Sequence, residues 1–210
     1  MDLSRGRHGH PGGRLYPALE RSHTVCGLDW FIIDAMCAFL GEQLKTHVVP
    51  PVALNISSQH VSDEDFTKKL LATADWRGVD PVFVSVEFSQ HLIATDERLV
   101  KTLIPSLLDA GFSVIADNFN AGPEMIAPLM HMGIATIKVS AECWRKRPVQ
   151  EVRALARVAD TLGVALIAEG VETDRELQAL KREGCLFAQG YHLARPMSLA
   201  KYFELCTSWA

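Results

Sequence analysis

From residue 50 onward, the chain contains short runs of apolar residues, rich in β-branched side chains, that are separated by longer amphipathic stretches. The runs are continuously apolar rather than alternating, which is typical of strands that are buried on both faces of a parallel sheet. We therefore predict strands at residues 52–56, 82–87, 112–117, 134–139, 164–169 and 186–189.

The stretches between these runs predict helices, at residues 28–44, 96–110, 148–162 and 174–183. The second of them opens with acidic residues and the third opens at Pro148, and both features favour the first turn of a helix. Gly111, Gly163 and Gly184 each follow a predicted helix, where a glycine supplies the left-handed residue that turns the chain into the next strand.

Strands that alternate with helices predict an α/β fold with a parallel sheet covered by helices. An open doubly wound sheet and a TIM-barrel-like (β/α) barrel both fit this pattern, but no G-x-G-x-x-G sequence follows the first strand, which disfavours a dinucleotide-binding sheet. A complete barrel typically needs about 250 residues, whereas this chain has 210. We predict a TIM-barrel-like barrel that is incomplete at its N-terminus, with a disordered tail at residues 1–13 and one domain at residues 14–210.

Composition narrows the class of protein. Apolar residues make up 48% and charged residues 22% of the chain, which is ordinary for a globular protein and excludes a disordered or collagen-like chain. The net charge of −4 and the lack of a helix-turn-helix pattern disfavour direct DNA binding. The 5 cysteines form no C-x-x-C pair, and no apolar run is long enough to span a bilayer. These features predict a cytoplasmic protein with reduced thiols, or one whose membrane portion lies on another chain.

Each predicted strand ends at, or one residue after, a polar residue in an apolar setting. These residues are Asn55, Glu87, Asp117, Lys138, Glu169 and Gln189. In a parallel barrel, the carboxyl ends of the strands meet at one mouth, where active sites are built. Polar residues at six successive strand ends therefore predict a shared site. Carboxylate and amide oxygens suit Mg²⁺, Mn²⁺ or Ca²⁺ as ligands.

A basic run beside an aromatic residue, Trp144-Arg145-Lys146-Arg147, stands apart from these positions. Such a run could contact phosphate or nucleic acid, or it could be a solvated loop. We favour the solvated loop.

Several motifs recur in a characteristic order along most of the chain. They are Leu54-Asn55-Ile56-Ser57, Val86-Glu87-Phe88-Ser89-Gln90, Ala116 to Gly122 (ADNFNAG), Ile137-Lys138-Val139-Ser140, Ala168 to Thr173 (AEGVET), Gln189-Gly190-Tyr191 and Arg195-Pro196. Residues 13–20 and 28–30 add weaker matches. With these motifs, the chain resembles the EAL family of bacterial cyclic-di-GMP phosphodiesterase domains over residues 10–205.

The resemblance implies a mechanism in which divalent ions activate a water that opens the cyclic dinucleotide. By position, it makes Asn55, Glu87, Asp117 and Glu169 the metal ligands. Lys138 and Glu169 would be the catalytic residues, and Gln189 and Asn118 would contact the ligand. The resemblance implies Mg²⁺ or Mn²⁺ as the metal.

The sequence departs from the family pattern at several of these positions. The glutamate that names the family has no counterpart, Asn118 replaces a second aspartate, and Gln90 replaces a loop-supporting glutamate. Asn120, Ala121 and Ser140 also differ from the family residues. An intact site sets about five carboxylates against two divalent ions, and the three that remain here balance one ion at most.

We therefore favour a catalytically degenerate EAL-like regulator that requires no metal. It would act through a regulatory protein partner, with residual cyclic-di-GMP binding, and the resemblance implies control of gene expression, motility or virulence. The alternative is an active metal-dependent cyclic-di-GMP phosphodiesterase with a reduced metal site.

Overall fold

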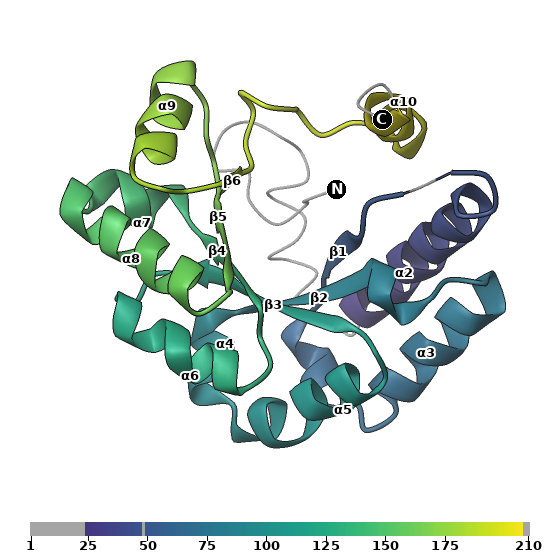
Figure 1. Ribbon diagram of the computed structural model, residues 1–210. Helices are drawn as coiled ribbons and strands as arrows, with labels where there is room; N and C mark the ends of the chain where they lie inside the picture. Colours follow the sequence, from purple (N-terminus) through teal and green to yellow (C-terminus); the bar gives the residue numbers. More distant parts are fainter. Residues whose placement is uncertain (1–23, 48, 208–210) are drawn as a thin grey trace. The chain divides into compact units, whose positions relative to one another are not determined.

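The computed structural model describes residues 24–47 and 49–207 (Figure 1). The chain divides into two compact units. Of the described residues, the first unit holds 24–47, 49–86, 110–112 and 196–207, and the second holds 87–109 and 113–195. The tail predicted at residues 1–13 and the motif at residues 13–20 lie outside the described residues.

Within the described residues, the strands form one six-stranded sheet in which neighbours in the sheet are neighbours in the sequence. They are β1 (Val52–Asn55), β2 (Val84–Ser89), β3 (Ser113–Phe119), β4 (Thr136–Val139), β5 (Ala165–Ala168) and β6 (Phe187–Ala188). Each of the pairs β3–β4, β4–β5 and β5–β6 is parallel. This confirms the predicted α/β class, a TIM-barrel-like sheet with fewer strands than a closed barrel.

Helices connect the strands along the chain (Figure 1). They are α2 (Thr24–Gln43), α3 (Phe66–Arg77), α4 (Gln90–Thr95), α5 (Ile104–Asp109), α6 (Ile126–His131), α7 (Ala141–Lys146), α8 (Val149–Thr161), α9 (Asp174–Arg182) and α10 (Leu199–Thr207). The amphipathic pattern of α8 buries Val152, Leu155, Ala156 and Ala159 at helical spacing, and this helix packs on β5. None of the described helices is long and apolar enough to cross a membrane.

The helix predicted at residues 96–110 is wrong in one respect. In its place, a π-helical turn at Leu99–Leu103 precedes α5, and the Ile104 N–H donates to the carbonyl of Leu99. The reason is Pro105, which has no N–H for an α-helical hydrogen bond and whose ring would clash with the carbonyl four residues earlier. The wider turn accommodates the proline without ending the helical path.

In the first unit, α2 and α3 pack closely. A Cβ atom added at Gly41 of α2 would lie 1.9 Å from the carbonyl oxygen of Arg77, so only glycine fits at this crossing. The Arg77 guanidinium in turn makes a bidentate ion pair with Asp34, at 2.8 Å. In the same unit, Asp29 is buried, and its carboxylate accepts from the Ser57 N–H at 2.9 Å and lies 3.2 Å from Nε2 of His60.

Candidate functional site

A buried lysine lies at the centre of the candidate site in the second unit. Lys138 projects from β4, and its ammonium donates to both carboxylate oxygens of Glu87 on β2, at 2.9 and 3.0 Å. The same ammonium lies 3.1 Å from Oε1 of Glu169, the residue that follows β5. The three side chains are 6%, 3% and 15% exposed. The structure therefore brings together three of the predicted site residues.

The charges in this cluster are strongly coupled. Burial alone would lower the pKa of Lys138, but the charges of Glu87, Glu169 and Asp117, with the hydrogen bond to Glu87, outweigh it and raise the pKa. Burial raises the pKa of Glu169 to about 7, with further upward contributions from Asp117 and Glu87 and an opposing one from Lys138. Asp117 thus acts electrostatically on both groups, which places it in the same site.

Asp117 and Asn118 lie at an irregularity within β3. The register between β3 and β4 shifts between Ala116 and Phe119, and Asn118 has a left-handed backbone with a φ of 59°. Asparagine tolerates this conformation better than most residues. The Asn118 N–H donates to Oδ1 of Asp117 at 2.7 Å, which fixes the carboxylate against its own backbone.

The other two predicted residues follow or end strands elsewhere in the sheet. Gln189 follows β6 with an exposed side chain, and its backbone carbonyl accepts from the Val171 N–H at 3.0 Å. Asn55 is the last residue of β1 and belongs to the first unit. The strands also run further than predicted at two positions, because β2 continues to Ser89 and β3 to Phe119.

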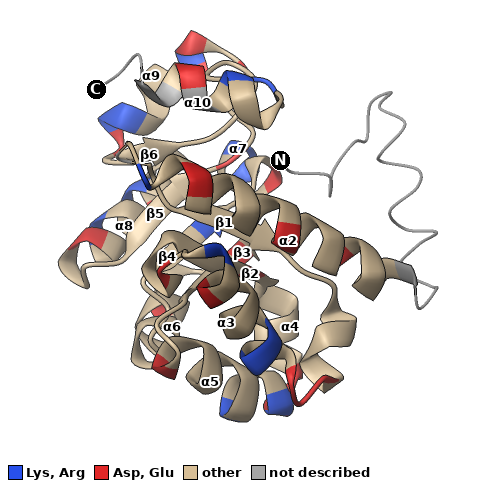
Figure 2. Ribbon diagram, turned by 90° about the vertical axis from the view of Figure 1, so that its right-hand side faces the viewer, with Lys and Arg blue, Asp and Glu red and all other residues tan. Residues whose placement is uncertain are grey.

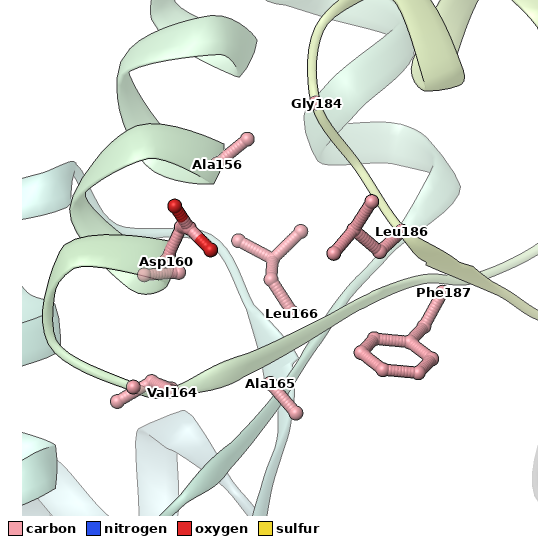
Figure 3. A pocket seen from close by; sticks show the side chains of 10 residues that line it. Ala156, Asp160, Val164, Ala165, Leu166, Gly184, Leu186 and Phe187 are labelled. Carbon is pink, nitrogen blue, oxygen red and sulfur yellow. The ribbon is translucent and has the colours of Figure 1, made fainter.

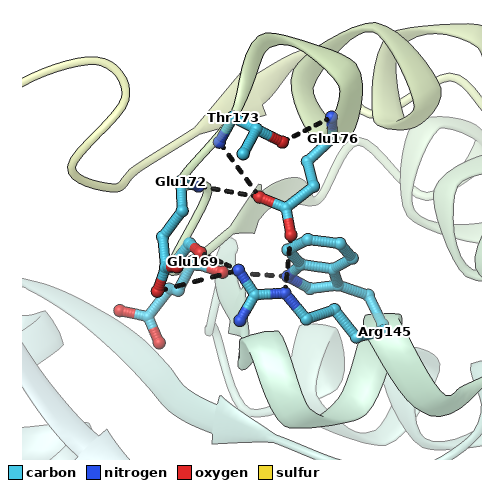
Figure 4. Close-up of polar contacts among 7 residues, drawn as sticks. Arg145, Glu169, Glu172, Thr173 and Glu176 are labelled. Carbon is cyan, nitrogen blue, oxygen red and sulfur yellow. Dashed lines mark hydrogen bonds and ion pairs between the residues drawn. The ribbon is translucent and has the colours of Figure 1, made fainter.

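The loop after β5 depends on a residue that the prediction did not include. Glu176, in the first turn of α9, accepts from the backbone N–H groups of Glu172 and Thr173, while the Thr173 hydroxyl accepts from the Glu176 N–H (Figure 4). This reciprocal capping box fixes the loop that begins at Glu169. Its signal, a threonine with a glutamate three residues later, is present in the sequence.

The oxygen donors at this site suit Mg²⁺ or Mn²⁺ by type. Three carboxylates and one ammonium leave a formal charge of −2, which balances one divalent ion and not two. Among residues 24–47 and 49–207, no group of three His, Cys, Asp or Glu side chains is arranged to hold a metal ion.

A pocket in the second unit lies at the other end of β5. Its volume is about 230 Å³, and it is lined by apolar residues such as Leu166, Leu186 and Phe187 together with the carboxylate of Asp160 (Figure 3). Its lining includes Gly163 and Val164, which precede β5, whereas Glu169 of the candidate site follows that strand. None of the predicted site residues lines this pocket.

Comparison with known proteins shows the family to which the chain belongs. The family model of the EAL domain matches residues 3–196, and the chain belongs to the EAL domain family of cyclic-di-GMP signalling proteins. It is 25% identical over 205 residues to the cyclic di-GMP phosphodiesterase PA2567 of Pseudomonas aeruginosa, covering 93% of this chain and 35% of that protein.

Two solved structures are also similar. The PaMucR phosphodiesterase in complex with c-di-GMP has a TM-score of 0.82 and 20% identity, covering 94% of this chain and 83% of that one. A manganese/cy-diGMP complex of Klebsiella pneumoniae BlrP1 has a TM-score of 0.72 and 25% identity, covering 87% and 47%. The chain spans 35% of the length of PA2567 and 23% of the length of the cyclic di-GMP phosphodiesterase PdeR of Escherichia coli.

The raised pKa of Glu169 predicts a dependence of stability on pH. Because its folded pKa of about 7 lies above the ordinary 4.5, ionisation of Glu169 is unfavourable in the folded chain. Its contribution to stability is therefore complete below pH 4.5 and is lost as the pH rises through 7. From pH 5 to 8, the unfolding free energy should fall by about 1–3 kcal/mol more in the wild type than in Glu169→Gln.

Urea titrations at a series of pH values measure this difference. The matched control is Glu172→Gln, which removes an exposed carboxylate three residues away and should follow the wild-type curve. Parallel curves for the wild type and Glu169→Gln would contradict the raised pKa.

Proposed function

We propose that this EAL domain, residues 14–210, is a catalytically degenerate regulator that acts by binding a protein partner and retains residual cyclic-di-GMP binding. The observation that carries the proposal is the charge of the site. Lys138 neutralises part of the carboxylate set, so the remaining charge of −2 favours one divalent ion over a pair. Two-metal hydrolysis requires both ions to stabilise the attacking and the leaving oxygen.

A further observation supports a weakened metal site. Asn118, at the position of the family's second aspartate, offers an amide oxygen without charge, which lowers the affinity for a second cation.

A protein partner fits the surface better than DNA does. Lys and Arg residues are interspersed with Asp and Glu residues along the helices (Figure 2), and the net charge is −4. Double-stranded DNA has a high negative charge density and is therefore bound best by a protein with a basic surface. We place the protein in the cytoplasm, where cyclic-di-GMP signalling would link it to gene expression, motility or virulence.

Hydrolysis of cyclic-di-GMP with Mg²⁺ or Mn²⁺ tests the proposal, with the linear dinucleotide measured by chromatography. We expect a rate at least about 100-fold below that of PA2567 assayed in parallel, because removing even one electrostatic group from such a site costs a factor of about 10²–10³. A rate near that of PA2567 would instead establish the alternative, an active phosphodiesterase with a reduced site.

A variant that restores family residues shows whether a low rate of hydrolysis comes from a weak metal site or from misfolding. Asn118→Asp with Gln90→Glu restores the family's residues at two positions and should raise the affinity for Mn²⁺ in calorimetry. Titration of the wild type with cyclic-di-GMP, with and without Mg²⁺, then shows whether the regulator retains the nucleotide.

A further inference from the structure

The basic run at residues 144–147 forms the end of α7 and the residue after it, and two of its four side chains are largely buried. The Trp144 side chain is buried, and Arg147 is 18% exposed. The predicted solvated loop is wrong, because residues 144–146 are helical, although Lys146 is solvated, with a side chain 73% exposed and paired with Glu142. The other three side chains donate hydrogen bonds to backbone carbonyls of two different loops.

Two of these side chains hold the loop after β5. The Trp144 indole N–H donates to the carbonyl of Glu169, and the Arg145 guanidinium donates to the carbonyl of Gly170, both at 2.9 Å (Figure 4). Arg145 is itself held by Glu176 at 2.8 Å, and its guanidinium lies 5.0 Å from the centre of the Trp144 ring. These contacts fix the backbone that carries the Glu169 carboxylate.

The third side chain holds the loop after β3. Nη2 of Arg147 donates to the carbonyl of Asn120 at 2.7 Å, and its other nitrogens contact Glu151 at 3.1 Å and the Cys143 sulfur at 2.9 Å. The N–H of Asn120 donates to Oε1 of Gln90, also at 2.7 Å. The peptide groups on both sides of Asn120 are therefore held by side chains, three residues after Asp117.

The helix that carries these side chains is joined closely to the strand of the central lysine. β4 ends at Val139, one residue after Lys138, and Ser140 caps α7 by accepting from the Cys143 N–H at 3.3 Å. We propose that α7 with Arg147 is a bracket that sets the positions of Asp117 and Glu169 about Lys138. Trp144, Arg145 and Arg147 are its positioning residues.

Such a bracket matters because the ion pairs of the site are short. Lys138 reaches Glu169 at 3.1 Å, so a small shift of the loop after β5 would break this contact. Outer contacts that orient charged groups commonly decide how a site binds its ligand. The bracket therefore links the geometry of the site to residues that do not touch it.

Hydrogen exchange of the ligand-free chain, followed by mass spectrometry, tests the bracket one loop at a time. Arg147→Met should speed exchange about five- to tenfold in residues 118–122, the effect of one hydrogen bond, and leave residues 169–173 unchanged. Arg145→Met should speed exchange in residues 169–173 and leave residues 118–122 unchanged. Arg147→Lys, which keeps one donor toward Asn120, should restore protection at least in part.

The control is Lys146→Met, which removes an exposed member of the same run and should change neither loop. Unchanged exchange in both loops for Arg147→Met and Arg145→Met would overturn the proposal. Equal acceleration throughout the chain, without rescue by Arg147→Lys, would overturn it as well, because it would show a general loss of stability. No ligand is present, so either result is independent of the proposed function.

Discussion

Replacing Lys138 with methionine should lower the free energy of unfolding by about 3–5 kcal/mol. The substitution removes the ammonium that lies 2.9 Å from the Glu87 carboxylate and 3.1 Å from the Glu169 carboxylate. Both carboxylates are mostly buried, so neither can recover full hydration. A buried charge that has lost its partner costs more than the ion pair gained, because the desolvation of the remaining charge is no longer offset.

Urea denaturation at pH 8 measures this loss, and two variants control it. Lys146→Met breaks an exposed pair and should cost less than about 1 kcal/mol. Adding Glu87→Gln to Lys138→Met removes one of the two buried carboxylates that faced the lysine and should recover part of the stability. The cost of Lys138→Met should also shrink at pH 5, where Glu169, with a pKa of about 7, is protonated. A cost equal to that of Lys146→Met would contradict a structural role for the buried cluster.

The positions of the strands could be predicted because burial on both faces requires continuous apolar runs. The predicted run at residues 134–139 contains β4, and the run at 164–169 contains β5. The helix at 96–110 was predicted from its flanking residues, and Pro105 within it changed the hydrogen-bonding pattern. A helix boundary can be predicted from its caps, whereas a local change of helical pitch depends on a single ring and carbonyl.

Part of the candidate site could be predicted in the same way. Glu87, Lys138 and Glu169 were found because a polar residue at the end of an apolar strand is unusual, and parallel strands bring such residues to one edge. The role of the basic run was missed. A charge run resembles a solvated surface in sequence, and only the structure shows that Arg147 reaches a carbonyl 27 residues earlier. Long-range contacts to backbone atoms leave no pattern in the local sequence.

A close approach of two loops explains why a glycine stands in the Gln189-Gly190-Tyr191 motif. Two backbone hydrogen bonds join the loops after β5 and β6 around it. The Val171 N–H donates to the carbonyl of Gln189, and the His192 N–H donates to the carbonyl of Val171, both at 3.0 Å. A Cβ atom added at Gly190 would lie 2.2 Å from the oxygen and 2.3 Å from the nitrogen of Val171.

Gly190→Ala should therefore cost about 3 kcal/mol or more of unfolding free energy, because the added methyl group must push apart backbone atoms that cannot rotate away. The matched control is Gly163→Ala. Gly163 has a left-handed φ of 67° but no atom within 4 Å of an added Cβ, so backbone strain alone should cost about 1–2 kcal/mol. Chemical denaturation of both variants separates steric overlap from strain. Equal costs would show that the two loops separate freely, and the close joining of the loops after β5 and β6 would then be wrong.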